Sequence, residues 1–92
     1  MSLYSVDIKE KAQLDLQKLL KDEPKLYKKA MKLIAELYEH PRTGTGKPKQ
    51  LSGDRAGQWR RKISDKHRLV YEIHDMEVIV LVLSAYGHYD DK

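Results

Sequence analysis

The sequence predicts an α+β domain in which two N-terminal helices pack on one face of a small antiparallel sheet of four or five strands. The N-terminal part holds two segments with apolar residues at helical spacing, and the C-terminal part holds alternating or continuous apolar runs typical of strands. A chain of 92 residues with 40% hydrophobic residues suits one domain over residues 1–92. Two helices can cover only one side of such a sheet. We therefore expect the other face to be the working surface.

The N-terminal segment predicts a short strand over residues 3–8 and then two helices. The first helix has one apolar face, made of Ala12, Leu16, Leu19 and Leu20. Asp22-Glu23-Pro24 predicts the turn between the helices, because proline is tolerated only at the start of a helix. The second helix has a broader apolar face and should end before Pro41. Its apolar residues are Leu26, Tyr27, Ala30, Met31, Leu33, Ile34, Leu37 and Tyr38.

The C-terminal half predicts an antiparallel series of strands. Residues 41–57 are rich in glycine, proline and basic residues, with a short edge strand expected over residues 48–51. Residues 59–63, 68–73 and 78–83 then read as three strands, the last of them apolar throughout and therefore central. Asp65-Lys66 and His74-Asp75 are the expected turns.

Charge is concentrated in the middle of the chain. Residues 41–71 hold nine lysines and arginines against two aspartates, whereas residues 72–92 hold one lysine against five acidic residues. A basic block of this kind is typical of a protein that binds a polyanion, most often a nucleic acid. The competing interpretation is a solvated face without a partner.

Several kinds of site can be set aside from the residue types. The chain has no cysteine, so disulfides and thiolate metal sites are excluded. The four histidines lack the spacing of a metal site, and we expect no metal or other cofactor. Gly44-Thr45-Gly46-Lys47 lacks the upstream glycine and the following Ser or Thr of a phosphate-binding loop.

The remaining chemistry-bearing residues suit cleavage of RNA without a metal ion. In that reaction a ribose 2′-hydroxyl attacks phosphorus, a base takes its proton, cations hold the developing charge and an acid protonates the leaving oxygen. Arginine matches phosphate oxygens, and His and Tyr can transfer protons. The candidates are Lys47, Lys49, Trp59, Arg61, Lys62, His67, Arg68, Tyr86, His88 and Tyr89. Taken singly, Trp59 suits the core and His67 a structural turn.

These residues occur in an order that resembles a known family. The runs are Gly46-Lys47-Pro48-Lys49-Gln50-Leu51, Gly57-Gln58-Trp59-Arg60-Arg61-Lys62-Ile63, His67-Arg68-Leu69-Val70-Tyr71 and His88-Tyr89. Together they resemble the YoeB/Txe toxins of the RelE superfamily. The resemblance implies the same helix-and-sheet fold, cleavage of mRNA in the ribosomal A site, and a cognate antitoxin that silences the toxin.

The resemblance also implies roles for individual residues. Arg68 would stabilise the transition state, and His88 and Tyr89 would position or protonate the leaving group. RNA binding would fall to Lys47, Trp59, Arg60, Arg61 and Lys62. Aromatic rings such as that of Trp59 can stack on unpaired bases.

Two departures from the family pattern bear on activity. Lys49 stands where the family has a glutamate proposed as the general base, and the chain continues past Tyr89 with Asp90-Asp91-Lys92. We interpret Lys49 as either a base or an additional phosphate clamp. The alternative is a catalytically impaired RNA- or partner-binding module of the same fold. A third reading is a relative that poisons a topoisomerase.

The expected setting is the cytoplasm. The N-terminus has too short an apolar run for a signal peptide, and the apolar run over residues 78–83 is far shorter than a membrane span. The expected partners are an antitoxin protein, the ribosome with its rRNA, and mRNA, and no membrane. Self-association stays open.

Overall fold

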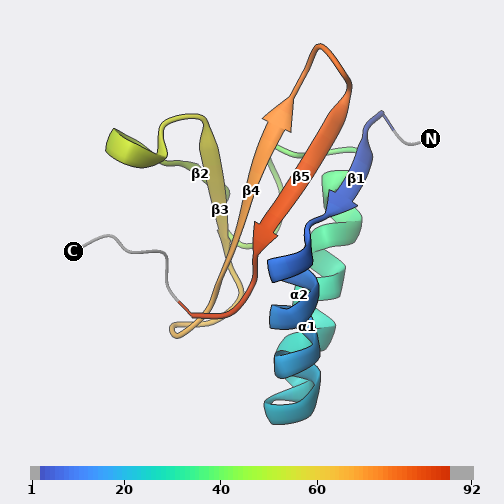
Figure 1. Ribbon diagram of the computed structural model, residues 1–92, viewed down its shortest axis with the longest axis vertical. Coiled ribbons are helices and arrows are strands. Elements are labelled where there is room, and N and C mark those ends of the chain that lie inside the picture. Colours follow the sequence, from blue (N-terminus) through green and yellow to red (C-terminus); the bar gives the residue numbers. More distant parts are fainter. Residues whose placement is uncertain (1–2, 88–92) are drawn as a thin grey trace.

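The computed structural model describes residues 3–87, which form two helices and a five-stranded sheet (Figure 1). In chain order the elements are β1 (Ser5–Ile8), α1 (Glu10–Asp22), α2 (Pro24–Leu37), β2 (Lys49–Gln50), the short 3-10 helix η1 (Gly53–Arg55), β3 (Gln58–Lys62), β4 (Arg68–His74) and β5 (Ile79–Ser84). The strands lie in the order β1-β5-β4-β3-β2. The predicted fold class and the order of its elements are confirmed.

The sheet is mixed rather than antiparallel throughout. Strands β2 to β5 pair antiparallel, but β1 pairs with β5 in parallel, with Val6 opposite Val80 and Ile8 opposite Val82. Hairpin turns force neighbouring strands to run in opposite directions, whereas β1 and β5 are separated by most of the chain. Because no hairpin joins β1 to β5, the antiparallel series of C-terminal strands did not determine the direction of β1.

Each helix buries one face, as the apolar spacing predicts. Helix α1 buries Ala12, Leu16 and Leu19, but Leu20 is 51% exposed, because Leu19 takes the buried position in that turn. Helix α2 buries Ala30, Leu33, Ile34 and Leu37. It ends at Leu37, a few residues before the predicted boundary at Pro41, and leaves Tyr38 39% exposed. Within residues 3–87, neither helix is long and apolar enough to span a membrane.

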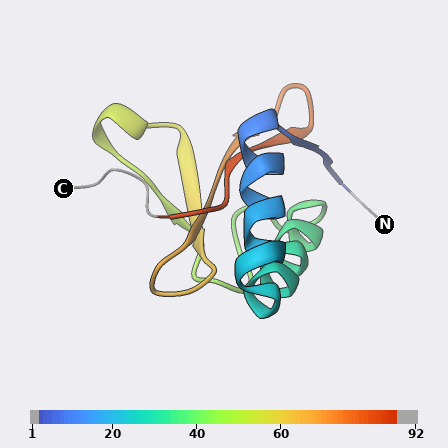
Figure 2. The same cartoon turned by 60° about the horizontal axis from the view of Figure 1, so that its bottom comes forward.

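The core lies between the helix pair and one face of the sheet. On the side of the sheet it contains Leu69, Tyr71, Val80 and Val82 from the strands and Ile63 just after β3, packed with the buried residues of α1 and α2. Figure 2 shows the two helices side by side, with β2 and β3 on the part of the sheet far from them. Side chains alternate between the two faces along a strand. The strand residues between these core positions therefore belong to the face that the helices leave open.

Candidate functional site

Four basic side chains share the open face of the sheet. Lys49 of β2 lies opposite Arg60 of β3, and Lys62 of β3 lies opposite Arg68 of β4. Cross-strand partners lie on the same face, and residues two apart along a strand do too. The alternate positions of β3 and β4 point to the core. We call Lys49, Arg60, Lys62 and Arg68 the cationic face.

Arg68 is held at the start of β4 by the turn that precedes it. Its Nη1 donates to the carbonyl oxygens of Ser64 at 2.5 Å, and of Asp65 and His67 at 3.3 Å each. Within residues 3–87, all the hydrogen bonds of this guanidinium leave from Nη1. One corner of the planar fork is thus fixed against the turn, and the side chain remains partly exposed. This is the geometry of an anchored cation rather than of a free surface arginine.

Lys62 lies opposite this arginine on β3, and Lys47 lies in a loop that is bonded to the end of β3. Lys62 Nζ lies 2.7 Å from Asp65 Oδ1, and the lysine side chain is 40% exposed. The backbone N–H of Lys62 donates to Gly46 O at 2.7 Å, which ties the residue before Lys47 to the end of β3. Lys47 is exposed and has a φ of 52°, a left-handed conformation that few non-glycine residues adopt. The hydrogen bond from Lys62 therefore fixes the backbone position of the loop next to Lys47.

Lys49, Arg60 and Trp59 differ in their surroundings. Lys49 is exposed on β2, at the edge of the sheet. Arg60 is partly buried, and its Nε is shielded from solvent and makes no hydrogen bond within the described residues. Trp59 pairs with Tyr71 and packs partly buried against the core, on the face opposite to the cations. A base stacked on this ring would therefore lie apart from the cationic face.

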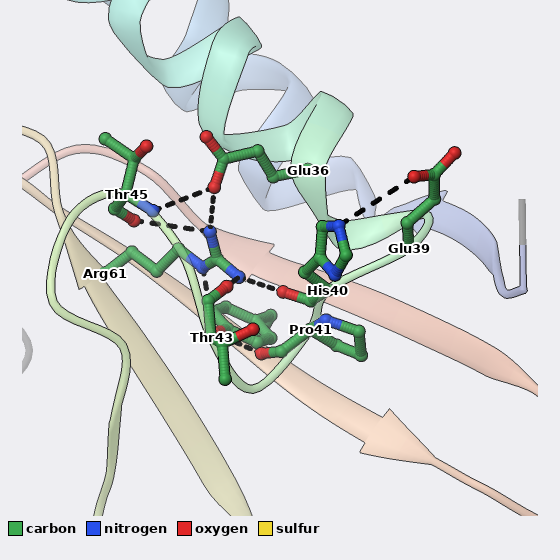
Figure 3. A network of polar contacts seen from close by, with 8 residues as sticks. Glu36, Glu39, His40, Pro41, Thr43, Thr45 and Arg61 are labelled. Atoms are coloured by element: carbon green, nitrogen blue, oxygen red, sulfur yellow. Dashed lines mark hydrogen bonds and ion pairs between the residues drawn. The ribbon is translucent and has the colours of Figure 1, made fainter.

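Arg61 does not lie where RNA could reach it, and its predicted role in RNA binding is corrected. Its side chain is fully buried, because its position in β3 points to the helices (Figure 3). The guanidinium donates from Nη1 to Glu36 Oε1 at 2.7 Å and from Nε to Tyr71 Oη at 3.2 Å. Further bonds go to the carbonyl oxygens of His40, Thr43 and Thr45. Arg61 thus joins α2 and the loop after it to the sheet.

The ion pair of Arg61 and Glu36 changes the acidity of the groups around it. Burial alone would raise the pKa of Glu36, but hydrogen bonds from Thr45 and Arg61 outweigh it and leave the pKa below its ordinary value. Burial raises the pKa of the Tyr71 hydroxyl, although Arg61 opposes the change. That hydroxyl donates to Pro41 O at 2.8 Å. The network therefore holds an ionised carboxylate and a neutral phenol.

His67 is buried, at 3% exposure, where the helix pair meets the end of the sheet. Its Nε2 lies 2.9 Å from Glu23 Oε2, and its Nδ1 accepts a hydrogen bond from the Gly87 backbone N–H at 2.7 Å. The Tyr86 ring lies 4.4 Å from the imidazole, centroid to centroid. His88 and Tyr89, the predicted proton-transfer pair, lie outside the described residues, as does the Asp90–Lys92 extension.

Sequence reasoning missed the partners of these buried polar groups. Glu23 is 44 residues from His67, and Glu36 is 25 residues from Arg61, so no local pattern joins them. One signal was available for Glu36, which is the single acidic residue of α2 and adjoins its apolar stripe.

Residues 3–87 contain no group of three or more His, Asp or Glu side chains arranged to hold a metal ion.

Comparison with known proteins places this geometry in a family. Residues 8–89 match the model of a YoeB-like toxin of bacterial type II toxin–antitoxin systems. Toxin YoeB of Streptomyces coelicolor is 42% identical over 65 residues, which cover 71% of this chain and 75% of that toxin.

Two solved structures have the same fold over nearly the whole chain. The YoeB/ParE toxin from Agrobacterium tumefaciens superposes with a TM-score of 0.85 at 28% identity, covering 92% of this chain and 99% of that one. A chain of the YoeB–YefM complex from Staphylococcus aureus gives 0.78 at 26% identity, covering 94% and 98%. The resemblance of the sequence motifs is confirmed. The chain belongs to the YoeB-like toxins of bacterial type II toxin–antitoxin systems.

Proposed function

We propose that this toxin is a ribosome-dependent endoribonuclease that cleaves mRNA in the A site without a metal ion. The observation that carries the proposal is the cationic face, where strand pairing aligns four basic side chains and the turn at 64–67 anchors one of them, Arg68. Fixed cations are suited to a reaction in which negative charge develops on phosphorus. No rearrangement of the sheet is needed to bring them together.

The reaction that suits these groups is internal transfer at phosphorus. The bond from the 2′-oxygen to phosphorus forms while the bond from phosphorus to the 5′-oxygen breaks. The 2′-hydroxyl proton passes to a base, and the 5′-oxygen receives a proton from an acid. The products are a 2′,3′-cyclic phosphate and a 5′-hydroxyl end, so no oxidant or second reactant is required.

Each part of the site has a role in this proposal. Arg68 stabilises the negative charge of the transition state through the donors of its planar fork. His88 and Tyr89 protonate or position the leaving 5′-oxygen. Lys47, Arg60 and Lys62 bind the phosphates on either side of the scissile bond, and Trp59 contacts RNA only from the opposite face of the sheet.

Lys49 acts as the base or as an additional phosphate clamp. It lies on the cationic face, opposite Arg60, where a further positive charge suits phosphate binding. The same position favours the competing proposal of a binding module without catalysis, since Lys49 replaces the family's carboxylate. Lys49→Ala separates these roles, because loss of a base changes the pH profile of cleavage, whereas loss of a clamp weakens binding across pH.

The proposed partners are the ribosome, mRNA and a cognate antitoxin, and the proposed setting is the cytoplasm where ribosomes act. A solved relative is a YoeB–YefM complex, which supports an antitoxin partner of the same kind. In this proposal the antitoxin silences the toxin by blocking access to the cationic face.

Inducible expression in bacteria tests the proposal. The wild-type chain should arrest growth with cleaved mRNA, and Arg68→Ala should relieve both effects. Arg42→Ala is the matched control, because Arg42 pairs with Asp75 away from the cationic face and its loss should leave the arrest intact. Arrest with intact mRNA would contradict the ribonuclease and favour a different target, such as a topoisomerase. Equal toxicity of the wild type and Arg68→Ala would remove Arg68 from the mechanism.

A further inference from the structure

The buried imidazole of His67 joins three parts of the chain that are distant in sequence. His67 itself lies in the turn between β3 and β4, Glu23 lies between the two helices, and Gly87 follows β5. His67 is 3% exposed, so its imidazole is shielded from solvent while both of its ring nitrogens have protein partners. A histidine with both ring nitrogens engaged and buried is a fixed element rather than a surface residue of a turn.

The two hydrogen bonds define the protonation of the ring. A backbone N–H can only donate, so Nδ1 must be an acceptor without a proton. The carboxylate of Glu23 is an acceptor, so Nε2 carries the proton and donates to it. Glu23 therefore selects the tautomer that can hold Gly87, in the way that a carboxylate orients a histidine in many active sites.

Gly87 is held from both sides of its backbone. Its N–H donates to His67 Nδ1 at 2.7 Å, and its carbonyl oxygen accepts from the Arg68 N–H at 3.0 Å. Both partners are consecutive residues at the start of β4, and the second is the anchored arginine of the cationic face. The next residues along the chain are His88 and Tyr89.

The segment before Gly87 is also fixed. The Tyr86 ring lies against the imidazole of His67, and Lys18 Nζ of α1 lies 4.3 Å from the centroid of the same ring. The backbone N–H of Ala85 donates to Asp15 Oδ2 at 2.9 Å. Helix α1 therefore supports residues 85–86, while His67 supplies the side-chain hydrogen bond to Gly87.

We propose that His67, oriented by Glu23, is a positioning residue that holds Gly87, the residue before His88 and Tyr89 in the sequence, against the start of β4 beside Arg68. This inference rests on the proposed ribonuclease function for its effect on cleavage. The contact between His67 and Gly87 stands apart from that function and can be measured without RNA. Positioning errors of about 1 Å can reduce a rate about 100-fold.

Two substitutions of His67 distinguish the contributions of the hydrogen bonds that its two ring nitrogens make. His67→Asn keeps an acceptor near the position of Nδ1 but loses the donor to Glu23. His67→Gln keeps a donor near the position of Nε2 but loses the acceptor for Gly87. His74→Gln is the matched control, since His74 pairs with Glu72 at the other end of β4.

The measurements are hydrogen exchange of the Gly87 amide by NMR and cleavage of a short mRNA on programmed bacterial ribosomes. We expect His67→Gln to expose the Gly87 amide to exchange and to lower kcat about 10- to 100-fold with little change in KM. His67→Asn should retain most of the protection and of kcat, and His74→Gln should match the wild type.

Three outcomes would overturn the proposal. They are an unprotected Gly87 amide in the wild type, wild-type cleavage by His67→Gln once its amide exchanges freely, and a folded His67→Asn that loses protection as fully as His67→Gln does. If His67→Gln does not fold, the comparison of His67→Asn with the wild type decides. If the wild type does not cleave mRNA at all, the proposed function fails, while exchange at Gly87 still tests the contact.

Discussion

Two arginines of the same sheet show that the face on which a strand residue lies determines its surroundings. Arg61 and Arg68 lie on adjacent antiparallel strands, but Arg61 pairs with Leu69 and faces the helices, whereas Arg68 pairs with Lys62 and faces outward. The buried arginine is surrounded by a carboxylate, a phenol and three carbonyl oxygens. The same type of side chain therefore stabilises the fold at one position and remains partly exposed on the open face at the other.

Removing the buried arginine should destabilise the protein strongly. Arg61→Ala removes the ion-pair partner of Glu36, which keeps only the hydrogen bond from the Thr45 N–H, and takes the donor from several carbonyl oxygens. The loss of one partner of a buried pair typically costs about 3–5 kcal/mol. Arg42→Ala is the matched control, because the ion pair of Arg42 with Asp75 is exposed and water screens it. Urea denaturation should show a large loss of unfolding free energy for Arg61→Ala and a much smaller one for Arg42→Ala. Equal losses would contradict the structural role of Arg61.

The lowered pKa of Glu36 makes its contribution depend on pH. The pKa is lower in the folded state than the ordinary value of about 4.3 in the unfolded chain, so the stabilisation is complete above that value and is lost as pH falls through the folded value. The difference in unfolding free energy between the wild type and Glu36→Gln should therefore be constant from pH 6 to about pH 5 and shrink below about pH 4. A difference that stays constant or grows on acidification would show that Glu36 is not ionised in the fold.

At the scale of elements, the loop between α2 and β2 determines where Lys47 lies. Gly46 has a φ of 88°, and a Cβ added there would lie 3.1 Å from Lys62 O and 3.3 Å from Leu33 Cδ2. The loop therefore passes so close to β3 and α2 that a methyl group at Gly46 would make its neighbours shift by a few tenths of an ångström. Gly53, in η1, also has a positive φ, of 66°, but a Cβ there would meet nothing within 4 Å.

These two glycines provide a controlled comparison. Gly46→Ala and Gly53→Ala both place alanine in a left-handed conformation, which costs about 1–2 kcal/mol. Gly46→Ala adds crowding against backbone and core, so thermal denaturation should show a further loss of about 1–3 kcal/mol relative to Gly53→Ala. Cleavage should fall with Gly46→Ala because Lys47 is displaced. Equal stability of the two variants would mean that the loop moves to accept the methyl group.

The sequence predicted most helices and strands, and it singled out the basic residues that the structure places on the cationic face. Helical spacing in residues 10–37 and alternation in residues 58–74 predicted α1, α2, β3 and β4 closely, because both patterns are local. The parallel direction of β1 was not predictable, since it depends on pairing with a strand at the other end of the chain. The bond from His67 to Glu23 was missed for the same reason, because the two residues are 44 positions apart. The burial of Arg61 was missed because a run of basic residues does not show which of them point to the core.

At the scale of the whole molecule, the two faces of the sheet carry different kinds of side chain. The face toward α1 and α2 carries the core and the network of Arg61 with Glu36, and the other face carries Lys49, Arg60, Lys62 and Arg68. The positive charge of residues 41–71, which suggested a polyanion partner, thus separates into one buried structural cation and a surface set.

The most direct test is cleavage of a defined mRNA on bacterial ribosomes in the presence of EDTA, with analysis of the new RNA ends. Since EDTA would also dissociate ribosomes, the chelator is added with spermidine and the integrity of the complex is checked by sedimentation. The wild type should produce a 2′,3′-cyclic phosphate and a 5′-hydroxyl end, and Arg68→Ala should reduce the rate at least about 100-fold, as loss of one transition-state donor typically does. Absence of cleavage by the wild type, or a 5′-phosphate end, would contradict the proposed mechanism.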